Sequence, residues 1–474
     1  MKKILVIDLD DTLISSDMLH ETFWTAFSND YKIPIKSIGW LIRGKEKLKS
    51  KLSISAEIIV ENLPYNKDVI DYIKQHREKG GYTALVTASN QAVAEKIAKY
   101  LNLFDEVKGS SENLNLKGHA KAKFLTTRFG IKNYDYMGDS LSDLPIWKNS
   151  NKAITVNANS NLIKKCEKIN SNCYHLQSEL SQNFFLNYLK VIRVYQWIKN
   201  ILVFLPMFAA HQLTKYNLVD SSLAFIAFCL IASSVYVIND LFDLNADRAH
   251  PNKKLRPFAL GTIPIKNGLI IFLLLFVPGI ALSFIIEFYF FLLMLIYFLL
   301  TFLYSIVLKK KVILDICILA ILYTLRIIGG SFATEIQISF WLFAFSIFLF
   351  LSLAAIKRQS ELVNLKNRKK KYTMRRGYQA NDLPIISMIA ISSGFISVLL
   401  AGLYINSPDV LTLYSKPWTL GAASIILLFW IMNIVFAGSR GLINDDPIIY
   451  AIKDNTSRMC FIAVILLLIT NFLK

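Results

Sequence analysis

The sequence has few cysteines, and their positions form no recognisable pattern. The five cysteines among 474 residues supply no metal-ligand pair and no disulfide framework. Internal repeats are missing too, and the one biased stretch of note is a basic run at residues 368–371. These absences exclude a disulfide-stapled secreted domain and a cysteine-based zinc module. We expect all the cysteines to be reduced, three of them inside apolar segments; they are Cys166, Cys173, Cys229, Cys317 and Cys460.

A secretory signal is missing as well. The first apolar run, Ile4–Ile7, ends in acidic residues and is too short for the hydrophobic core of a signal peptide. It has the length of a buried strand. We therefore expect the N-terminal part of the chain to stay in the cytoplasm.

Hydrophobic residues make up 54% of the chain, but they are unevenly distributed. Residues 1 to about 185 have the composition of a soluble domain, whereas the chain from about Val191 onward is a series of apolar runs long enough to cross a bilayer. We predict about nine such runs, centred near Phe204, Phe228, Phe276, Phe298, Ile321, Phe348, Phe395, Ile426 and Val464. The predicted organisation is a domain at 1–160, a linker at 161–190 and an all-α membrane bundle at 191–474.

The net charge of +19 has a topological explanation. With the N-terminus inside, the loops after the even-numbered helices are basic, and the opposite loops carry little beyond Lys215 and Lys416. This asymmetry follows the positive-inside rule. It predicts an integral inner-membrane protein whose basic loops face the cytoplasm, and it accounts for the charge without nucleic acid.

Four segments of the N-terminal part place polar side chains where strands or helices end. The strand Ile4–Ile7 leads into Asp8 and Asp10, and a second strand at residues 82–86 leads into Thr87. A helical segment carries Lys121, and a strand at residues 134–137 leads into Asp139 and Asp143. The carboxyl ends of parallel strands meet at one edge of a sheet, where α/β folds place their chemistry.

These segments resemble the four motifs of the haloacid dehalogenase superfamily of phosphatases, over about residues 3–160. The resemblance implies a Rossmann-like α/β domain with an inserted helical cap at about 15–79. It implies that Asp8 is the nucleophile, that Asp10 is the general acid and base, and that Thr87 and Lys121 hold the phosphoryl group. Lys117 is an alternative for the lysine. Mg²⁺ would be held by Asp8, Asp10, Asp139 and Asp143.

The stretch at residues 239–247 ends a long apolar run. Asp240, Asp243 and Asp247 are spaced by three and four residues, so they share one helical face with Tyr236. Three anions so close would repel one another unless they share a divalent metal ion. Hard oxygen ligands of this kind suit Mg²⁺ bridging to a diphosphate.

The acidic stretch resembles the Asn-Asp-x-x-Asp-x-x-x-Asp signature of the UbiA superfamily of intramembrane transferases. The resemblance runs from about Arg193 to the C-terminus and includes residues 196–200 and Arg256-Pro257. It implies Mg²⁺-assisted departure of diphosphate from either a prenyl diphosphate or phosphoribosyl diphosphate.

The basic segment at residues 247–257 favours the second electrophile, since a 5-phosphate needs its own donors. The segment is similar to that of the bacterial polyprenyl-phosphate phosphoribosyltransferases. Where ordinary prenyltransferases have a second Asp-rich motif, this chain has Glu361 beside Lys357 and Arg358. The predicted substrate-binding residues are Lys199, Asn200, Asn239, Arg248, Lys253, Lys254, Arg256, Tyr304, Lys309, Arg326, Lys357, Arg358 and Glu361.

Three further acidic residues belong to the membrane half. Asp315 and Arg326 are eleven residues apart on one side of the fifth helix, and we expect them to point into the bundle and to pair. Asp445 and Asp446 are predicted to lie on the cytoplasmic side, and no role follows from the sequence.

Together these features predict a bifunctional enzyme. It would transfer 5-phosphoribose from phosphoribosyl diphosphate to a polyprenyl phosphate in the bilayer, and the phosphatase domain would remove the 5-phosphate. Two alternatives stay open: a prenyltransferase with a phosphatase of unrelated substrate, and a non-enzymatic transporter or scaffold. Mg²⁺ is the predicted cofactor, no nucleic acid is expected, and a homo-oligomer is left open.

Overall fold

The computed structural model describes residues 3–111, 115–177, 184–250, 252–367, 376–443 and 446–470. The basic run at 368–371 and Asp445 lie outside the described residues. The chain forms two compact units, of which the first combines Met1–Ile192 with Tyr236–Phe272 and the second combines Arg193–Val235 with Leu273–Lys474. Residues 236–272, which the sequence assigns to the membrane half, therefore belong to the first unit.

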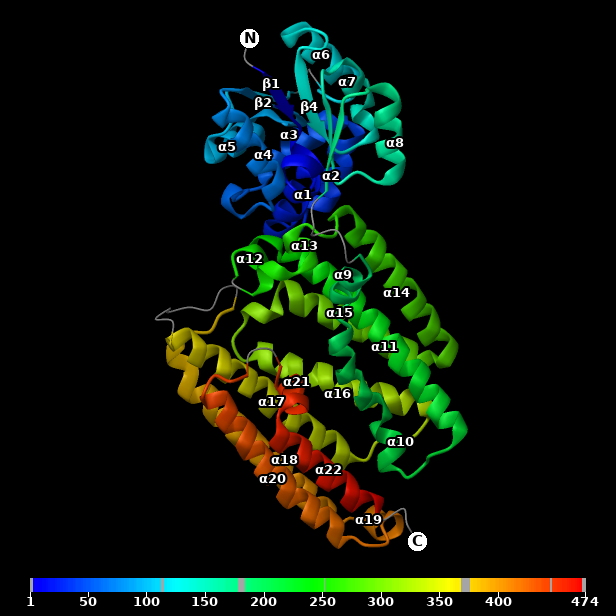
Figure 1. Cartoon of the computed structure of the whole chain (residues 1–474). Coiled ribbons are helices and arrows are strands. Elements are labelled where there is room, and N and C mark those ends of the chain that lie inside the picture. The colour runs from blue at the N-terminus through cyan, green and yellow to red at the C-terminus, as the bar shows by residue number, and fades with distance from the viewer. Residues whose placement is uncertain are drawn as a thin grey trace. The chain divides into compact units, whose positions relative to one another are not determined.

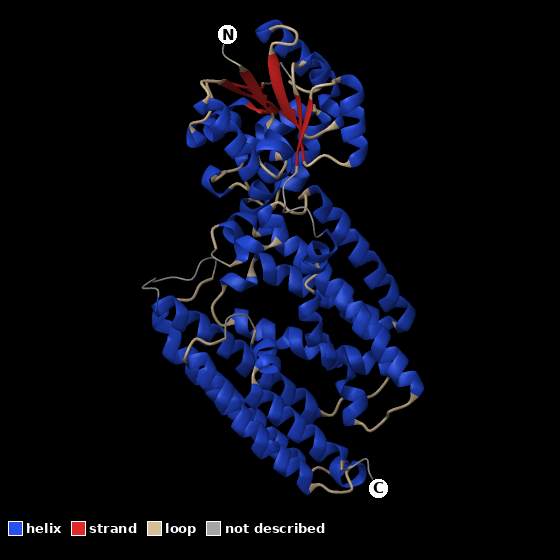
Figure 2. Ribbon diagram, viewed as in Figure 1, coloured by secondary structure: helices blue, strands red, loops and turns tan. Residues whose placement is uncertain are grey.

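The first unit is built on a parallel sheet of six strands in the order β3-β2-β1-β4-β5-β6 (Figures 1 and 2). The strands are β1 (Ile4–Ile7), β2 (Tyr82–Asn90), β3 (Glu106–Ser110), β4 (Tyr134–Gly138), β5 (Ala153–Val156) and β6 (Cys173–Leu176). β1 lies between β2 and β4, with Val6 opposite Ala84 on one side and Tyr136 on the other. This order brings the ends of β1, β2 and β4 together.

Side chains along each strand point alternately to the two faces of the sheet, and both faces are buried. Leu5 and Ile7 of β1 belong to one buried apolar cluster, whereas Val6 belongs to another on the opposite face. Helices α4 (Lys67–Glu78) and α5 (Gln91–Leu101) cover the first face. The second face is covered by α6 (His119–Phe129), α7 (Leu144–Asn149) and α8 (Ser160–Ile169). A sheet buried on both faces is typical of parallel α/β folds.

Three helices between β1 and α4 form the predicted cap: α1 (Met18–Asn29), α2 (Ile33–Ile42) and α3 (Lys45–Ser55). They share a small apolar cluster that includes Ala26, Ile33 and Leu52. Helix α4, which also falls within the predicted cap range of about 15–79, packs instead against the sheet through Val69 and Ile73. The predicted linker likewise contains α8 and β6, which extend the sheet domain, before α9 (Phe184–Val191).

The second unit is helical. Within the described residues, seven helices are long and apolar enough to cross a membrane, and a bent pair, Phe185–Val191 with Val194–Ala209, raises the number to as many as eight. The seven are α11 (Lys215–Phe242), α14 (Lys266–Ile286), α15 (Phe288–Ile306), α16 (Leu314–Thr334), α17 (Phe340–Asn367), α18 (Leu383–Tyr404) and α20 (Trp418–Ser439). Shorter helices are α10 (Leu205–Ala209), α19 (Pro408–Leu413), α21 (Pro447–Lys453) and α22 (Asn455–Ile469), the last of them apolar. The bundle is thus roughly consistent with the nine predicted runs.

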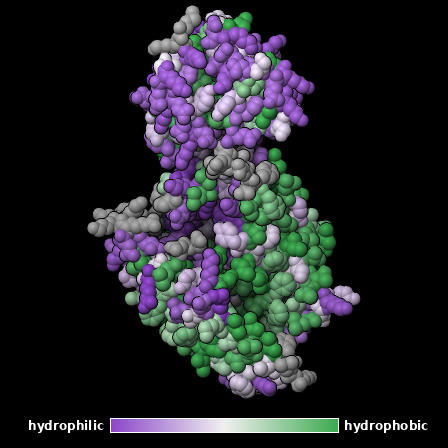
Figure 3. All heavy atoms as spheres, in the orientation of Figure 1, coloured by the Kyte–Doolittle hydropathy of each residue, from purple (hydrophilic) through white to green (hydrophobic). Residues whose placement is uncertain are grey.

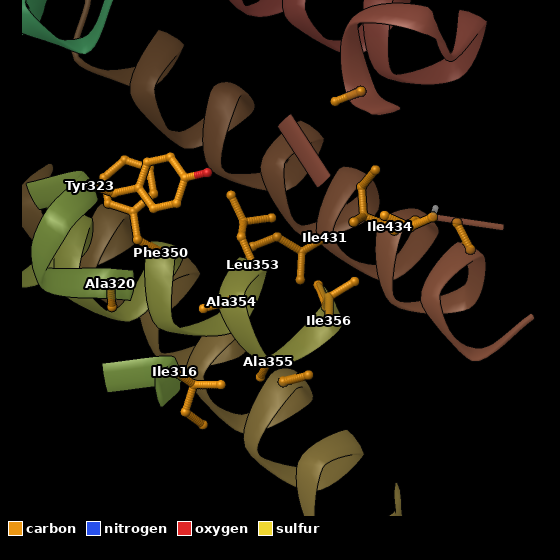
Figure 4. Packing of buried hydrophobic residues seen from close by; sticks show 14 of the residues in the cluster. Ile316, Ala320, Tyr323, Phe350, Leu353, Ala354, Ala355, Ile356, Ile431 and Ile434 are labelled. Carbon is orange, nitrogen blue, oxygen red and sulfur yellow. The ribbon is translucent and has the colours of Figure 1, made fainter. Parts of the chain in front are cut away.

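On the face shown in Figure 3, apolar residues occupy much of the surface of the helical part, whereas hydrophilic residues dominate the surface of the sheet domain. Inside the bundle, α16, α17 and α20 meet around small residues such as Ala354 and Ala355 (Figure 4). Tyr323 and Phe350 stack there with ring centroids 5.0 Å apart. Small residues allow close approach of membrane helices. The predicted fold class, a Rossmann-like α/β domain followed by a helical membrane bundle, is confirmed.

Candidate functional site

The first candidate site lies at the carboxyl end of β1. The backbone N–H of Asp8 donates to the Met137 carbonyl on β4 at 3.0 Å, which fixes Asp8 where the two strands end. The following loop, Leu9–Leu13, turns sharply, and Asp11 adopts a positive φ of 52°. This turn keeps Asp8 and Asp10 at the edge of the sheet.

Lys121 is the lysine that the fold brings to Asp8. Its Nζ lies 2.7 Å from Asp8 Oδ2 and 3.1 Å from the Tyr136 hydroxyl, and all three side chains are buried. Burial alone would lower the pKa of Lys121, but the carboxylates of Asp8 and Asp143 outweigh it and raise that pKa. Lys117, the alternative, is exposed.

Three carboxylates converge beside this ion pair. Ligand oxygens of Asp8, Asp139 and Asp143 all lie within 4.8 Å of one another, and this is the one such group of three among the described residues. Burial, followed by repulsion from Asp143 and Asp8, raises the pKa of Asp139 to about 9. Burial and Asp8 also raise the pKa of Asp143. A crowded set of hard oxygen donors whose ionised form is disfavoured fits a divalent cation such as Mg²⁺.

Asp10 stands apart from this group. Its Oδ1 accepts a hydrogen bond from the Met18 N–H at 2.8 Å, and its Oδ2 accepts one from the Ser89 hydroxyl at 2.6 Å. Asp10 was predicted to bind the metal through its side chain, but it is not a member of the observed group of three carboxylates. Burial and then the neighbouring anions Asp17 and Asp8 raise the pKa of Asp10 to about 7, which suits a group that gives and takes a proton.

Two more side chains belong to this site: Thr87, which the sequence predicted, and Tyr136, which it did not. Thr87 is buried within β2, which extends to Asn90 rather than ending at residue 86, and its hydroxyl accepts from the Ser89 N–H. Tyr136 donates to Asp143 at 3.0 Å and receives the bond from Lys121. In the sequence, Tyr136 is indistinguishable from a core aromatic residue of a strand.

The second candidate site is the acidic motif, Asp240, Asp243 and Asp247. The long helix α11 ends at Phe242 and α12 (Leu244–Arg248) begins two residues later, so the motif crosses a helix break. The N–H of Asp243 donates to the Asn239 carbonyl and the N–H of Asp247 donates to that of Asp243, at 2.9 and 2.8 Å. The predicted helical spacing thus survives the break.

Arg256 bridges the motif. Its Nη1 lies 3.1 Å from Asp240 Oδ1 and 2.6 Å from Asp247 Oδ2, and both carboxylates are only 3% exposed. Burial raises the pKa of Asp247 to about 6, against the opposing effect of Arg256 and with help from Asp240. The three carboxylates do not converge as closely as the group around Asp8. The bound guanidinium of Arg256 shows that the acidic motif attracts a cation. The carboxylate oxygens of the motif are donors that suit Mg²⁺.

The basic segment divides into two parts. Lys253 and Lys254 are exposed in a 3₁₀ turn before α13 (Pro257–Leu260), at the surface where a phosphate contact was predicted. Arg248 corrects the prediction: its guanidinium is buried and bound to Glu21 of the cap at 2.6 and 2.9 Å. The Nε of Arg248 donates to the Ala259 carbonyl at 3.0 Å, so this residue holds protein groups rather than a surface for substrate.

In the second unit, Asp446 binds two predicted substrate-binding lysines. Lys199 Nζ lies 2.7 Å from its carboxylate and Lys357 Nζ lies 3.5 Å away, while the Tyr323 hydroxyl donates at 2.9 Å. Burial would raise the pKa of Asp446, but the two ammonium groups hold it well below its usual range. The sequence offered no role for Asp446, because the helices that supply its partners are far away in the chain.

The remaining cations of the second unit have other partners than expected. Asp315 does not pair with Arg326; it accepts from Arg358 and from the Tyr304 hydroxyl, the latter at 2.7 Å. Arg358 also binds Glu361, at 2.5 Å. Asn200 and Tyr297 bind Arg326 at 2.8 and 2.9 Å, and Lys309 lies half-buried in a 3₁₀ turn.

Two family models match the chain. The UbiA prenyltransferase family matches residues 201–446, and the haloacid dehalogenase-like hydrolases match residues 45–148. The first match includes the whole acidic motif. The second begins after Asp8 and Asp10, so the geometry at the end of β1 is what joins Asp8 to Lys121 and Asp139.

Curated relatives extend the comparison. Protein y4nM of Sinorhizobium fredii is 35% identical over 455 residues, which cover 96% of this chain and 88% of that protein. Nodulation protein NoeC of Azorhizobium caulinodans is 31% identical over 60% of this chain and 92% of its own length. The decaprenyl-phosphate phosphoribosyltransferase of Mycolicibacterium smegmatis is 32% identical over 60% of this chain and 91% of that enzyme.

Proposed function

Because the chain belongs to the UbiA prenyltransferase family and carries a haloacid dehalogenase-like hydrolase domain, we propose that it is a bifunctional membrane enzyme of lipid-linked sugar synthesis. It transfers 5-phosphoribose from phosphoribosyl diphosphate to a polyprenyl phosphate and then removes the 5-phosphate. The observation that carries the proposal is the likeness to decaprenyl-phosphate phosphoribosyltransferase over 91% of that enzyme's length. The predicted topology places both activities on the cytoplasmic side of the inner membrane.

The acidic motif receives the diphosphate. Asp240, Asp243 and Asp247 would hold Mg²⁺, which when bound offsets the charge of the departing diphosphate. Arg256 then exchanges a carboxylate partner for a phosphate oxygen, a contact that guanidinium makes readily. The exposed Lys253 and Lys254 bind the 5-phosphate.

Transfer itself needs little proton chemistry. The bond between ribose C1 and the diphosphate oxygen breaks, and diphosphate leaves with the electron pair. A phosphate oxygen of the polyprenyl phosphate then bonds to C1. This nucleophile is already an anion, so no strong general base is required. The lipid tail lies along the apolar helices, and Lys199, Lys357 and the polar residues around them attract anionic groups.

The phosphatase domain acts on the product. Asp8 attacks the phosphorus of the 5-phosphate, while Lys121 and Thr87 hold the phosphoryl oxygens. Asp10 gives a proton to the ribose oxygen as it leaves and then takes one from the water that hydrolyses the aspartyl-phosphate. Asp8, Asp139 and Asp143 would hold Mg²⁺, which when bound neutralises phosphoryl charge.

Fusion of the two activities has a kinetic advantage. A tethered second site meets the product at an effective concentration on the order of millimolar. Hydrolysis of the phosphomonoester also removes the product of the first step, which draws transfer forward.

The test is mass spectrometry of lipids after incubation of the purified chain with Mg²⁺, phosphoribosyl diphosphate and a polyprenyl phosphate. A lipid that gains ribose without its 5-phosphate is the expected product. A lipid that keeps the phosphate would leave the transferase but separate the phosphatase from it. No transfer, together with reaction of a prenyl diphosphate with an aromatic acceptor, would replace the proposal with prenyl transfer.

A further inference from the structure

Helix α1 of the cap contacts both candidate sites of the first unit. At its start, the Met18 N–H donates to Asp10 of the phosphatase site. Further along, its side chains reach the segment that carries the acidic motif, and Glu21 pairs with Arg248. Because residues 236–272 belong to the same compact unit as the cap, these are contacts within one unit. Twelve helical residues span roughly 18 Å, so one short helix connects the two groups.

Glu21 and Arg248 form a buried ion pair that engages both carboxylate oxygens of Glu21. Glu21 is 2% exposed, and both of its carboxylate oxygens accept from the guanidinium of Arg248. Ser16 donates a further bond to Glu21 at 2.6 Å. A buried bidentate pair has a defined orientation, and removing one partner leaves the other charge uncompensated.

Apolar and polar contacts surround the pair. Phe242, at the end of α11, packs on Trp24 and Phe27 of α1, with ring centroids 5.5 and 4.6 Å apart. The side-chain amide of Asn245 donates to the Thr25 hydroxyl at 3.2 Å. These contacts lie between the first and last aspartates of the motif, so α1 packs directly on the acidic stretch.

Arg248 connects this interface to the motif itself. It follows Asp247 directly, and its Nε holds the Ala259 carbonyl. Between residues 247 and 259 lies Arg256, the residue that bridges Asp240 and Asp247. The bond to Ala259 therefore closes a loop that begins next to Asp247 and contains Arg256, the cationic partner of that aspartate.

We propose that Glu21, a residue of the phosphatase cap, is a positioning residue for the acidic motif. It fixes the direction of Arg248, and Arg248 fixes the loop that places Asp247 and Arg256. The catalytic consequence rests on the proposed transferase function, whereas the positioning of the segment does not. The cap thus takes part in the chemistry of the other half of the chain without touching its substrate.

The experiment compares Glu21→Gln, Arg248→Gln and the double variant in the full-length chain. The matched control is Glu95→Gln, the same change at an exposed glutamate of α5. Backbone amide exchange is followed for residues 240–261 and for the buried strand β1. In parallel, the dependence of phosphoribosyl transfer on Mg²⁺ and donor concentration is measured.

In Glu21→Gln we expect exchange of residues 240–261 to rise at least about tenfold while β1 is unchanged. The Mg²⁺ or donor concentration needed for half-maximal transfer should rise about tenfold or more, as for other groups that orient metal ligands. The double variant should be no worse than the worse single one, because the two residues act through one contact. Glu95→Gln should behave like the parent.

Unchanged exchange of residues 240–261 in Glu21→Gln would overturn the proposal, and so would an equal rise in β1, which would indicate general destabilisation. If exchange rises but the concentration dependence of an active parent does not change, the positioning role is wrong. A parent without transfer activity would refute the proposed function, and the exchange data would still decide whether Glu21 holds the segment.

Discussion

Two cations, Lys121 and Arg256, each face a group of buried carboxylates. Lys121 pairs with Asp8 beside Asp143, and Arg256 bridges Asp240 and Asp247. In both places, replacement of one carboxylate by an amide removes a negative charge from the group and leaves the size of the side chain nearly unchanged. Aspartate-to-asparagine substitutions are therefore the sharpest probes at the scale of the residue.

Asp8→Asn should abolish the phosphatase activity and leave transfer intact. The amide cannot act as the nucleophile, while Lys121 keeps Asp143 as a nearby anion, so the domain should stay folded. Lipid mass spectrometry should show a product that retains its 5-phosphate. The control is Asp68→Asn on the exposed face of α4. If Asp8→Asn made the same final lipid as the parent, the coupling of the two activities would be refuted.

Asp243→Asn should abolish transfer in a folded chain. Asp243 is half-buried at the break between α11 and α12. Its replacement by asparagine removes one of the three carboxylates that are proposed to bind Mg²⁺. Transfer is measured with labelled phosphoribosyl diphosphate, and Asp220→Asn on α11 is the control. Retained activity would remove the motif from the mechanism.

Sequence patterns anticipated residues that are close neighbours in the chain or that end a strand. Asp8, Asp139 and Asp143 meet as expected because parallel strands deliver their ends to one edge, and helix α6 adds Lys121 to them. Asp446 and Glu21 could not be assigned, since their partners come from distant segments. Arg248 was predicted to bind phosphate because its sequence neighbours are basic, but its burial against Glu21 depends on tertiary packing.

At the scale of elements, the turn after α13 lies close to the turn before α1. Gly261 has a φ of +76°, and a Cβ added there would lie 2.5 Å from the Ser15 carbonyl oxygen. Both the backbone conformation and the space exclude a side chain unless one of the turns moves.

Gly261→Ala should therefore lower the free energy of unfolding of the first unit by about 1–3 kcal/mol. Chemical denaturation monitored by backbone amide exchange of the buried strands β1 and β4, which belong to the first unit, measures the change. Gly39→Ala, in the middle of α2 with open space around its Cα, is the matched control and should raise stability by about 0.5–1 kcal/mol. Equal effects of the two substitutions would contradict the close approach of the turns.

The boundaries of elements show the limits of local patterns. β1 follows from its apolar run, and the helix around Lys121 follows from its position between Gly118 and Gly130. β6 and α8 were assigned to a linker because Asn, Ser and Lys dominate that stretch, although Leu162 and Cys166 are buried against the sheet. The break at Asp243 was not foreseen, because spacing alone does not distinguish one helix from two that continue in phase.

At the scale of the whole molecule, the proposed function assigns a divalent cation to both activities. Removal of Mg²⁺ by a chelator should abolish lipid transfer and phosphatase turnover, and added Mg²⁺ should restore both. Two separate assays, one with the lipid acceptor and one with a small soluble phosphomonoester, measure the two activities. Persistence of either activity without metal would exclude the corresponding carboxylates as metal ligands.

A mixture of Asp8→Asn and Asp243→Asn chains tests whether the two sites cooperate within one molecule. Each variant supplies the activity that the other lacks, so the mixture should form the dephosphorylated lipid more slowly than the parent. The deficit should shrink as protein concentration rises, because exchange between molecules lacks the effective concentration of a tether. Equal rates at all concentrations would show that the intermediate diffuses freely.

The division of the chain into units has a consequence for the order of its synthesis. The first unit needs residues 236–272, which follow α11 in the chain. A growing chain therefore releases the sheet and the cap from the ribosome long before the last segment of their unit exists. During that interval α11 enters the bilayer, and the ion pair between Glu21 and Arg248 has not yet formed. Completion of the first unit thus depends on insertion of a membrane helix, an order of events opposite to the usual folding of N-terminal domains first.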